Sequence, residues 1–406
     1  NGSTWVMDTG DLNGIDDDEN GKIDDLIGWD FMATSNGGET NNPYENSGHG
    51  TNVSGILSAR TNNTIGVSSL AWNLTLMPVS CSYPGSSSIY NGYQGIIYAA
   101  ENGADIINCS WGGTTYSQAN QEAINYAYSL GSIIVAAAGN SNNTVPVYPS
   151  AYQNVLAVAA LQNNGEKSSV SCYGAFVDVG APTGSIGTLS GSGYTTVSNA
   201  TSYASPVGSS LVGLIKSYYP EISQSALLNR IKGSCDDVDA VNPGKENLLG
   251  EGKLNARRAL QEENPLPDEE IRLALIENRG ATDANGNLAV EPGETFSVNL
   301  LLRSYGEYST YGTFTLSTTN PNVNILSGSH NQSIPADAYF TLEEVFNIYV
   351  LPTATSQYVT FNLQTNADIP VVVGDNLSFS ILINAGGIFV WEGISGGRDM
   401  SGTFIK

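Results

Sequence analysis

The chain has 406 residues, long enough for two or three domains, and carries 39 acidic residues against 15 Lys and Arg, a formal charge of −24. This acidity repels phosphate backbones and excludes nucleic acid as an expected partner, whereas it favours divalent cations such as calcium. No run of about 18 apolar residues occurs, so no membrane span is predicted.

The first 261 residues have the pattern of one α/β domain. Residues 1–48 are turn-rich and acidic, and from residue 50 apolar runs alternate with segments of helical spacing. We predict strands and helices in this part of the chain from that spacing: strands at 74–79, 104–108, 132–138 and 155–160, and helices at 93–102 and 117–130. Such alternation is typical of βαβ units around a parallel sheet.

The pattern changes after residue 261. Residues 262–270 are polar, charged and proline-bearing, as in a linker. Short alternating strands follow, separated by Asn, Gly and Pro turns, at 295–300, 313–316, 359–363 and 377–381. The sequence therefore predicts a β-sandwich over 271–386, with 387–406 as the start of a further segment.

The cysteines give little functional information. The four cysteines allow three disulfide pairings, and no C-x-x-C spacing indicates a zinc or thioredoxin-type site. Cys109 lies in an apolar run and is expected to be a small buried side chain.

One of the two histidines lies in a pattern that suits a general base. His49 stands between glycines, and the small residues of the helix that follows would let it pack closely and hold the imidazole in place. An isolated histidine is more often structural. The other one, His330, lies in a polar turn of the predicted β-sandwich.

A serine and an asparagine form two further candidate clusters. Ser202 opens an apolar helix that ends before Pro220, and free N–H groups at a helix N-terminus stabilise negative charge beside a nucleophile. Taken alone, such a serine is more often a helix cap. Asn140 follows the predicted strand 132–138, where it either makes a turn or directs its amide at an oxyanion.

In this order the three clusters resemble the subtilases, the subtilisin-like serine peptidases. Residues 49–55 (His-Gly-Thr-Asn-Val-Ser-Gly) match the family's histidine motif, residues 200–206 (Ala-Thr-Ser-Tyr-Ala-Ser-Pro) its nucleophile motif, and residues 138–140 (Ala-Gly-Asn) its oxyanion motif. The resemblance covers roughly residues 5–261. It implies a parallel sheet with helices on both faces, followed here by the β-sandwich.

The resemblance also implies a mechanism and a polypeptide substrate. His49 would take the proton of Ser202, which attacks a peptide carbonyl, while Asn140 and the Ser202 N–H stabilise the oxyanion. An extended substrate would pair as an added strand with one segment, and a second segment would wall the specificity pocket. These segments are Ser110, Trp111 and Gly112, and then Ala137, Ala138 and Gly139.

The carboxylate that orients the histidine has two candidate positions. Asp8, in Asp-Thr-Gly, matches the family's aspartate motif. A second alignment fits more residues, because it places 5–11, 13–21 and 28–31 on an insert found in many bacterial members. In that alignment the family's aspartate lies upstream of Asn1, and we expect the chain to be a piece of a longer protein.

Three departures from the motifs leave a second function class open. Asn52, Ala200 and Tyr203 stand where the family has histidine, glycine and methionine. The alternative to an active endopeptidase is a catalytically inactive subtilisin fold that serves as a surface or adhesion module.

An acidic loop near the N-terminus is predicted to bind a structural calcium ion. Asp16, Asp18 and Asn20 supply oxygens at alternate positions before a glycine, a spacing that resembles a calcium loop. Ile27 stands where the last acidic ligand is expected, and Asp24 or Asp25 could replace it. The alternative is a solvated acidic loop.

The predicted β-sandwich resembles accessory domains that follow the peptidase in secreted Bacteroidetes proteins. This weaker resemblance rests on Asn-Gly turns before residues 291–294 (Glu-Pro-Gly-Glu). We therefore expect a secreted or cell-surface protein, with any surface attachment made by regions outside this chain. Binding, spacing and stabilisation all remain open as roles for the domain.

Overall fold

The structure is a computed structural model of the chain. It describes residues 12–34, 38–44, 48–184, 186–189, 193–261, 263, 265–287, 289–373 and 377–384. Asp8 and the segment 387–406 lie outside the described residues, as do residues 262 and 264 of the predicted linker.

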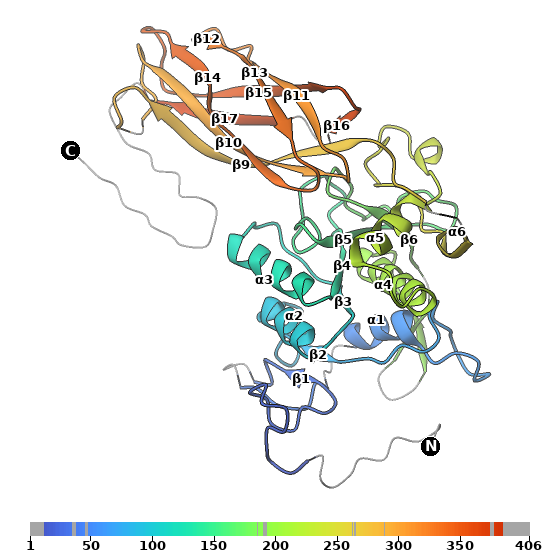
Figure 1. The fold of residues 1–406 in the computed structure, drawn as a ribbon. Coiled ribbons are helices and arrows are strands. Elements are labelled where there is room, and N and C mark those ends of the chain that lie inside the picture. Colours follow the sequence, from blue (N-terminus) through green and yellow to red (C-terminus); the bar gives the residue numbers. More distant parts are fainter. Residues whose placement is uncertain are drawn as a thin grey trace.

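The first part of the chain forms an α/β region (Figure 1). Its central sheet has four strands in the order β3-β4-β5-β6, and all neighbouring strands are parallel. Their bounds are Ile106–Cys109, Ile133–Ala137, Val155–Leu161 and Val179–Pro182. Two further pairs of strands are β1 with β2 (Trp29–Asp30, Val79–Ser80), which are parallel, and β7 with β8 (Ile186–Thr188, Tyr194–Thr196), which are antiparallel.

Helices cover both faces of the central sheet. Successive side chains of a strand point to opposite faces, so neighbouring residues of one strand pack against different helices. In β4, Ile134 packs in one core with α2 and α3, and Val135 packs in another with α4 and α5. The helices of the region are α1 (His49–Ser58), α2 (Gly92–Glu101), α3 (Gln118–Ser129), α4 (Thr201–Tyr218), α5 (Gln224–Gly233) and α6 (Ala256–Gln261), with a 3-10 turn at Asp239–Val241. The predicted parallel sheet with helices on both faces is confirmed.

The strand predicted at 74–79 is largely wrong. Only Val79 of that run belongs to a strand, the two-residue β2, while Leu76 and Met77 are exposed. A strand needs a partner along its length, and β2 is paired only with the equally short β1.

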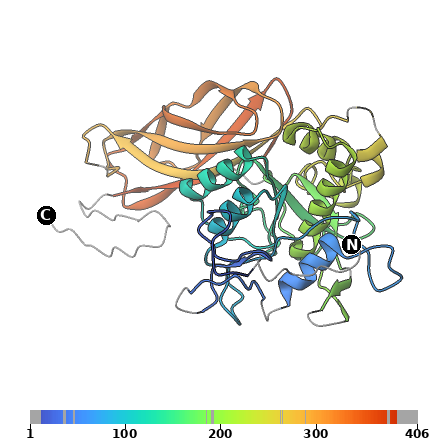
Figure 2. The ribbon, with the colours of Figure 1, turned by 60° about the horizontal axis from the view of Figure 1, so that its bottom comes forward.

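The second part of the chain is a sandwich of two sheets around one apolar core. The larger sheet has the order β12-β14-β10-β9-β16 and the smaller β13-β11-β15-β17. In chain order, β9 to β17 span Ile271–Asp283, Thr295–Tyr305, Thr310–Ser317, Val323–Ser327, Ser329–Ile334, Tyr339–Val350, Gln357–Ala367, Val371–Val373 and Leu377–Ile383. Their pairs are antiparallel except for β16 with β9, so the predicted β-rich region is confirmed. Figure 2 shows it packed along one side of the α/β region.

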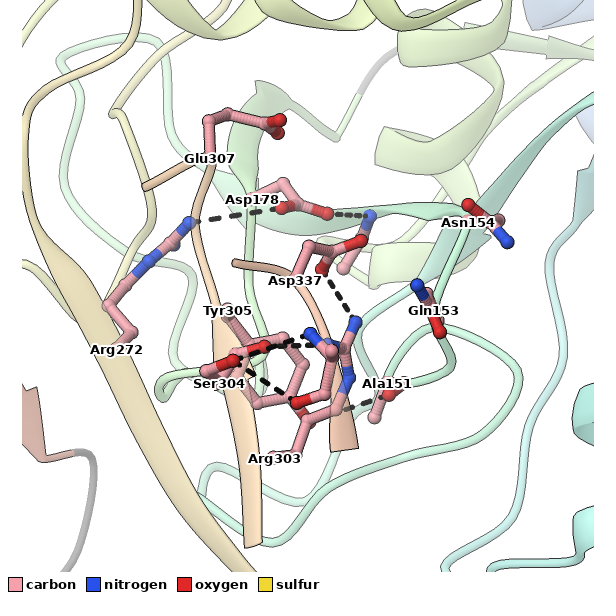
Figure 3. Close-up of polar contacts among 12 residues, drawn as sticks. Ala151, Gln153, Asn154, Asp178, Arg272, Arg303, Ser304, Tyr305, Glu307 and Asp337 are labelled. Atoms are coloured by element: carbon pink, nitrogen blue, oxygen red, sulfur yellow. Dashed lines mark hydrogen bonds and ion pairs between the residues drawn. The ribbon is translucent and has the colours of Figure 1, made fainter. Parts of the chain in front are cut away.

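Buried charges join the two regions (Figure 3). Arg272 of β9 is 1% exposed and lies 3.8 Å from Asp178, 4.0 Å from Glu251 and 3.7 Å from Glu270. Lys232 of α5 bridges Asp178 at 3.1 Å and Glu307 of the sandwich at 2.9 Å. Removing one member of a buried ionic group leaves an uncompensated charge, so this cluster fixes the regions against each other.

The four cysteines are free thiols in the structure, and Cys109 is buried as expected. Within the described residues, no helix combines the length and apolar character needed to cross a membrane.

Candidate active site

His49 is the first residue of α1, and small residues determine where that helix lies. Gly48 precedes it with φ of 74°, a left-handed conformation that suits glycine. A Cβ on Gly55 would approach the Thr188 hydroxyl of β7 to 2.1 Å, so this position must be glycine. Thr188 in turn donates to the Thr51 carbonyl at 2.7 Å, which fastens α1 to the hairpin.

Ser202 lies in the first turn of α4. Ala200 is the N-cap and makes no side-chain cap bond, so the reading of Ser202 as a helix cap is wrong. Pro206 has no N–H for the Ser202 carbonyl four residues back, and the Ser110 hydroxyl donates to that carbonyl instead, at 2.8 Å. The Ser202 hydroxyl donates to the Ser110 carbonyl at 3.3 Å, so the two serines are bonded in both directions.

Asn140 follows β4 and is bound to the residue before Ser202. Its Oδ1 accepts the backbone N–H of Thr201 at 2.8 Å and the Thr201 hydroxyl at 2.9 Å. A backbone N–H can only donate, so the side-chain oxygen must face Thr201. The Asn140 NH₂ is therefore the half of the amide that can donate to a bound group.

His49 lies where α1 packs on α4, the helix that carries Ser202. The His49 ring lies 5.6 Å from the ring of Tyr203, the residue after Ser202, with the planes tilted by 47°. His49 and Asn140 thus each contact a residue next to Ser202, His49 at Tyr203 and Asn140 at Thr201, near the carboxyl end of the parallel sheet. Ligands of such sheets bind at this end.

Both predicted substrate segments lie at the same end of the sheet. Residues 110–112 follow β3, and the Trp111 ring meets Tyr93 edge-on at 5.4 Å. Ala137 and Ala138 are buried at the end of β4. Gly139 follows with φ of 105°, where a Cβ would come within 2.8 Å of Val147.

Asn108 is a site residue that the sequence reasoning missed. Its Oδ1 accepts from the Ser205 and Ser209 hydroxyls of α4 at 2.8 and 3.0 Å, and its NH₂ donates to Ser110 at 2.9 Å. It therefore ties β3, α4 and the segment after β3 together. An asparagine inside an otherwise apolar strand, with serines four residues apart on a later helix, was the signal available.

The predicted calcium ligands lie in one loop, but their carboxylates face backbone N–H groups. Asp16 accepts from Asn20 and Gly21 at 3.1 and 2.8 Å, and Asp24 accepts from Asn13 at 2.9 Å and from Gly14 at 3.1 Å. Asp18 accepts from the Asn20 side chain at 3.0 Å. The donor set suits calcium, yet no three acidic, His or Cys side chains in the described ranges converge on a metal position.

Serine, histidine and asparagine are residue types that serine hydrolases use. The family described as "Subtilase family" matches residues 6–252, more than half of the chain, which therefore belongs to this family of serine peptidases. Thermitase from Thermoactinomyces vulgaris is 36% identical over 258 residues, 63% of this chain and 87% of that protein. Subtilisin DY from Bacillus licheniformis is 38% identical over 230 residues, 55% of this chain and 81% of that protein.

A solved structure agrees with this assignment. A protease from Pseudoalteromonas arctica superimposes with a TM-score of 0.51 at 28% identity, over 58% of this chain and 83% of that one. These comparisons support the family. They do not support the narrower resemblance to Bacteroidetes proteins.

Proposed function

We propose that the chain is a secreted endopeptidase that cleaves polypeptides by acyl transfer, with Ser202 as nucleophile and His49 as general base. The observation that carries this proposal is the anchoring of Asn140 by Thr201, which leaves its NH₂ group available beside Ser202. That group and the N-terminus of α4 would stabilise an oxyanion formed on the carbonyl under attack.

The proposal also requires a carboxylate that orients the His49 ring, and two positions for it stay open. Either Asp8 or an aspartate upstream of Asn1 would hold the His49 ring. Residues 110–112 would pair with the substrate backbone, and residues 137–139 would wall the pocket for the side chain next to the cleaved bond. Support comes from their common position at the end of the sheet.

We also propose that Asp16, Asp18, Asn20 and Asp24 hold a structural calcium ion. The oxygen donors and the charge of −24 support this, and the loop would exchange its N–H contacts for the cation. Calcium would order the loop and take no part in the reaction.

A fluorophosphonate probe tests the proposal, since it reacts with an activated serine. Labelling is expected at Ser202, and Ser202→Ala and His49→Ala should abolish it. Ser129→Ala, which changes an exposed serine of α3, is the matched control and should label normally. An unlabelled chain that carries its upstream sequence would instead favour the inactive surface module. Asp8→Asn identifies the carboxylate that orients His49. Loss of labelling would show that Asp8 has this role, and unchanged labelling would assign the role to the upstream residue.

A further inference from the structure

We propose that Tyr339 of the β-sandwich is a positioning residue for the substrate segment, defined as residues 110–117. This inference rests on the proposed function, because it assigns a support to the strand on which a polypeptide would bind. It gives the β-sandwich a role in substrate binding that nothing in the peptidase motifs indicates.

The first end of the substrate segment is fixed at the nucleophile. Ser110 exchanges hydrogen bonds with Ser202 at 2.8 and 3.3 Å, and Trp111 packs against Tyr93. These contacts come from the peptidase region and hold only the beginning of the segment.

The other end is held by two buried tyrosines. Gly113 and Tyr148 exchange backbone hydrogen bonds of 2.9 and 2.7 Å. The Ser117 N–H donates to the Tyr152 hydroxyl at 3.0 Å. Tyr148 and Tyr152 are 4% and 2% exposed, and their rings lie 4.5 Å apart.

Tyr339 reaches this group from the sandwich. Its ring lies 5.3 Å from that of Tyr116, which in turn lies 5.7 Å from Tyr148 and 5.8 Å from Tyr152. Aromatic pairs in this range of 4.5–7 Å contribute about 0.5–1.5 kcal/mol beyond burial. Tyr116 is thus packed between the tyrosines of the peptidase region and the ring of the sandwich.

A buried arginine fixes the Tyr339 ring. The Arg303 guanidinium lies 5.0 Å from the centre of that ring and 4.7 Å from the centre of the Tyr305 ring. Asp337 binds Arg303 at 2.6 Å, and the Tyr305 hydroxyl donates to the Ala151 carbonyl of the α/β region at 3.4 Å (Figure 3). The Tyr339 ring therefore packs against a guanidinium that is held by Asp337 and stacks on Tyr305, and Tyr305 is hydrogen-bonded across the interface.

The ring of Tyr339, and not its hydroxyl, makes the contact. The hydroxyl oxygen is buried and has no hydrogen-bond partner among the described residues, and burial raises the pKa of Tyr339. Removing an unsatisfied buried hydroxyl is neutral or stabilising. Phenylalanine should therefore replace Tyr339 without loss, whereas alanine should not.

Steady-state kinetics on the full chain test the inference. Tyr339→Ala should raise KM for a tetrapeptide p-nitroanilide by roughly threefold to tenfold with kcat little changed, because the substrate segment loses its support while the nucleophile keeps its own contacts. A single-residue ester, too short to span the segment, should show no such rise. Tyr339→Phe should restore the KM of the parent chain.

Hydrogen exchange supplies a readout that does not require activity. In Tyr339→Ala the amides of Gly113 and Ser117 should exchange faster, and in Tyr339→Phe they should not. Tyr311→Ala, which removes an exposed tyrosine of the same sandwich, is the control. If Tyr339→Ala does not fold, Tyr339→Leu is read in the same way.

The two proposals fail in different ways. A parent chain that carries its upstream sequence and still does not react with fluorophosphonate contradicts the proposed function, while exchange at Gly113 and Ser117 still decides the role of Tyr339. Unchanged exchange, or an equal rise in KM for the ester, would overturn the positioning role.

Discussion

Ser110 donates its hydroxyl hydrogen to the Ser202 carbonyl at 2.8 Å, in place of the N–H that Pro206 lacks. A bond from the segment after β3 thereby completes the first turn of α4. The backbone at the nucleophile and the backbone expected to bind substrate are thus held by one contact.

A double-mutant cycle tests this relationship. Ser110→Ala should lower the free energy of unfolding by about 1–2 kcal/mol, because the Ser202 carbonyl loses its partner in a buried place. Pro206→Ala supplies an N–H to that carbonyl, so Ser110→Ala should cost less in its presence. Urea denaturation of the four chains measures the difference. An equal cost of Ser110→Ala in both backgrounds would show that proline and serine act independently.

Two substitutions of Asn140 separate anchoring from catalysis. Asn140→Asp keeps an oxygen for the Thr201 N–H but replaces the NH₂ group, whereas Asn140→Ala removes both. Each should lower kcat about 10²–10³-fold, the usual loss for one oxyanion donor, and only the alanine variant should also lose stability, by about 1 kcal/mol. Peptide hydrolysis and urea denaturation provide the two measurements. An aspartate variant with near-parent kcat would contradict the role of the amide.

The contribution of Glu270 to the stability of the chain should fall as the pH rises from about 4.5 to about 7. Burial raises the pKa of Glu270 from 4.5 to about 7 even though Arg272 lies 3.7 Å away and lowers it, since Glu251 and Asp268 raise it further. The folded state then binds a proton that the unfolded state releases. The contribution of this group is full below about pH 4.5 and is lost as the pH rises through about 7.

Glu270→Gln should therefore flatten the decrease in the free energy of unfolding between about pH 5 and pH 8. Denaturation at a series of pH values measures this slope. Glu343→Gln, which neutralises an exposed carboxyl of the sandwich, should leave the slope as it is in the parent chain. A slope that Glu270→Gln does not change would assign the effect to other groups.

Chelation should destabilise the chain if the acidic loop binds calcium. A ligand present at a hundred times its Kd stabilises the folded state by about 2.7 kcal/mol, so EDTA should lower the melting temperature measurably. Asp16→Asn should remove that dependence, while Asp105→Asn, at an exposed carboxyl outside the loop, should keep it. No response to EDTA in the parent chain would leave the loop as a solvated turn held by its own N–H bonds.

The parallel sheet could be predicted because its order is local. The runs that became β3, β4 and β5 are mainly apolar, and the helices that precede β3 and β4 are each followed by a glycine, Gly103 and Gly131. The run at 74–79 is also largely apolar, but it contains Pro78 and forms no strand before Val79, since strand formation also depends on a partner that composition does not reveal.

Only those site residues that stand in sequence motifs could be predicted. His49, Ser202 and Asn140 stand in motifs, so their meeting could be expected. The bonds from Asn108 to Ser205 and Ser209 join residues about a hundred positions apart, and no local pattern encodes such a contact. The contact of Tyr339 with Tyr116 was equally hidden, because it depends on how two separately patterned regions dock.

The buried ionic contacts of Arg272 and Lys232 restrict how this chain can be divided or recombined. Cutting after α6 would leave Asp178 and Glu251 facing water without the arginine that neutralises them. A sandwich grafted from another protein would have to carry charged residues that pair with the carboxylates and the lysine on the α/β side of the interface. Substitutions on the two sides are therefore expected to be inherited in pairs, and the two regions to behave in evolution as a single unit.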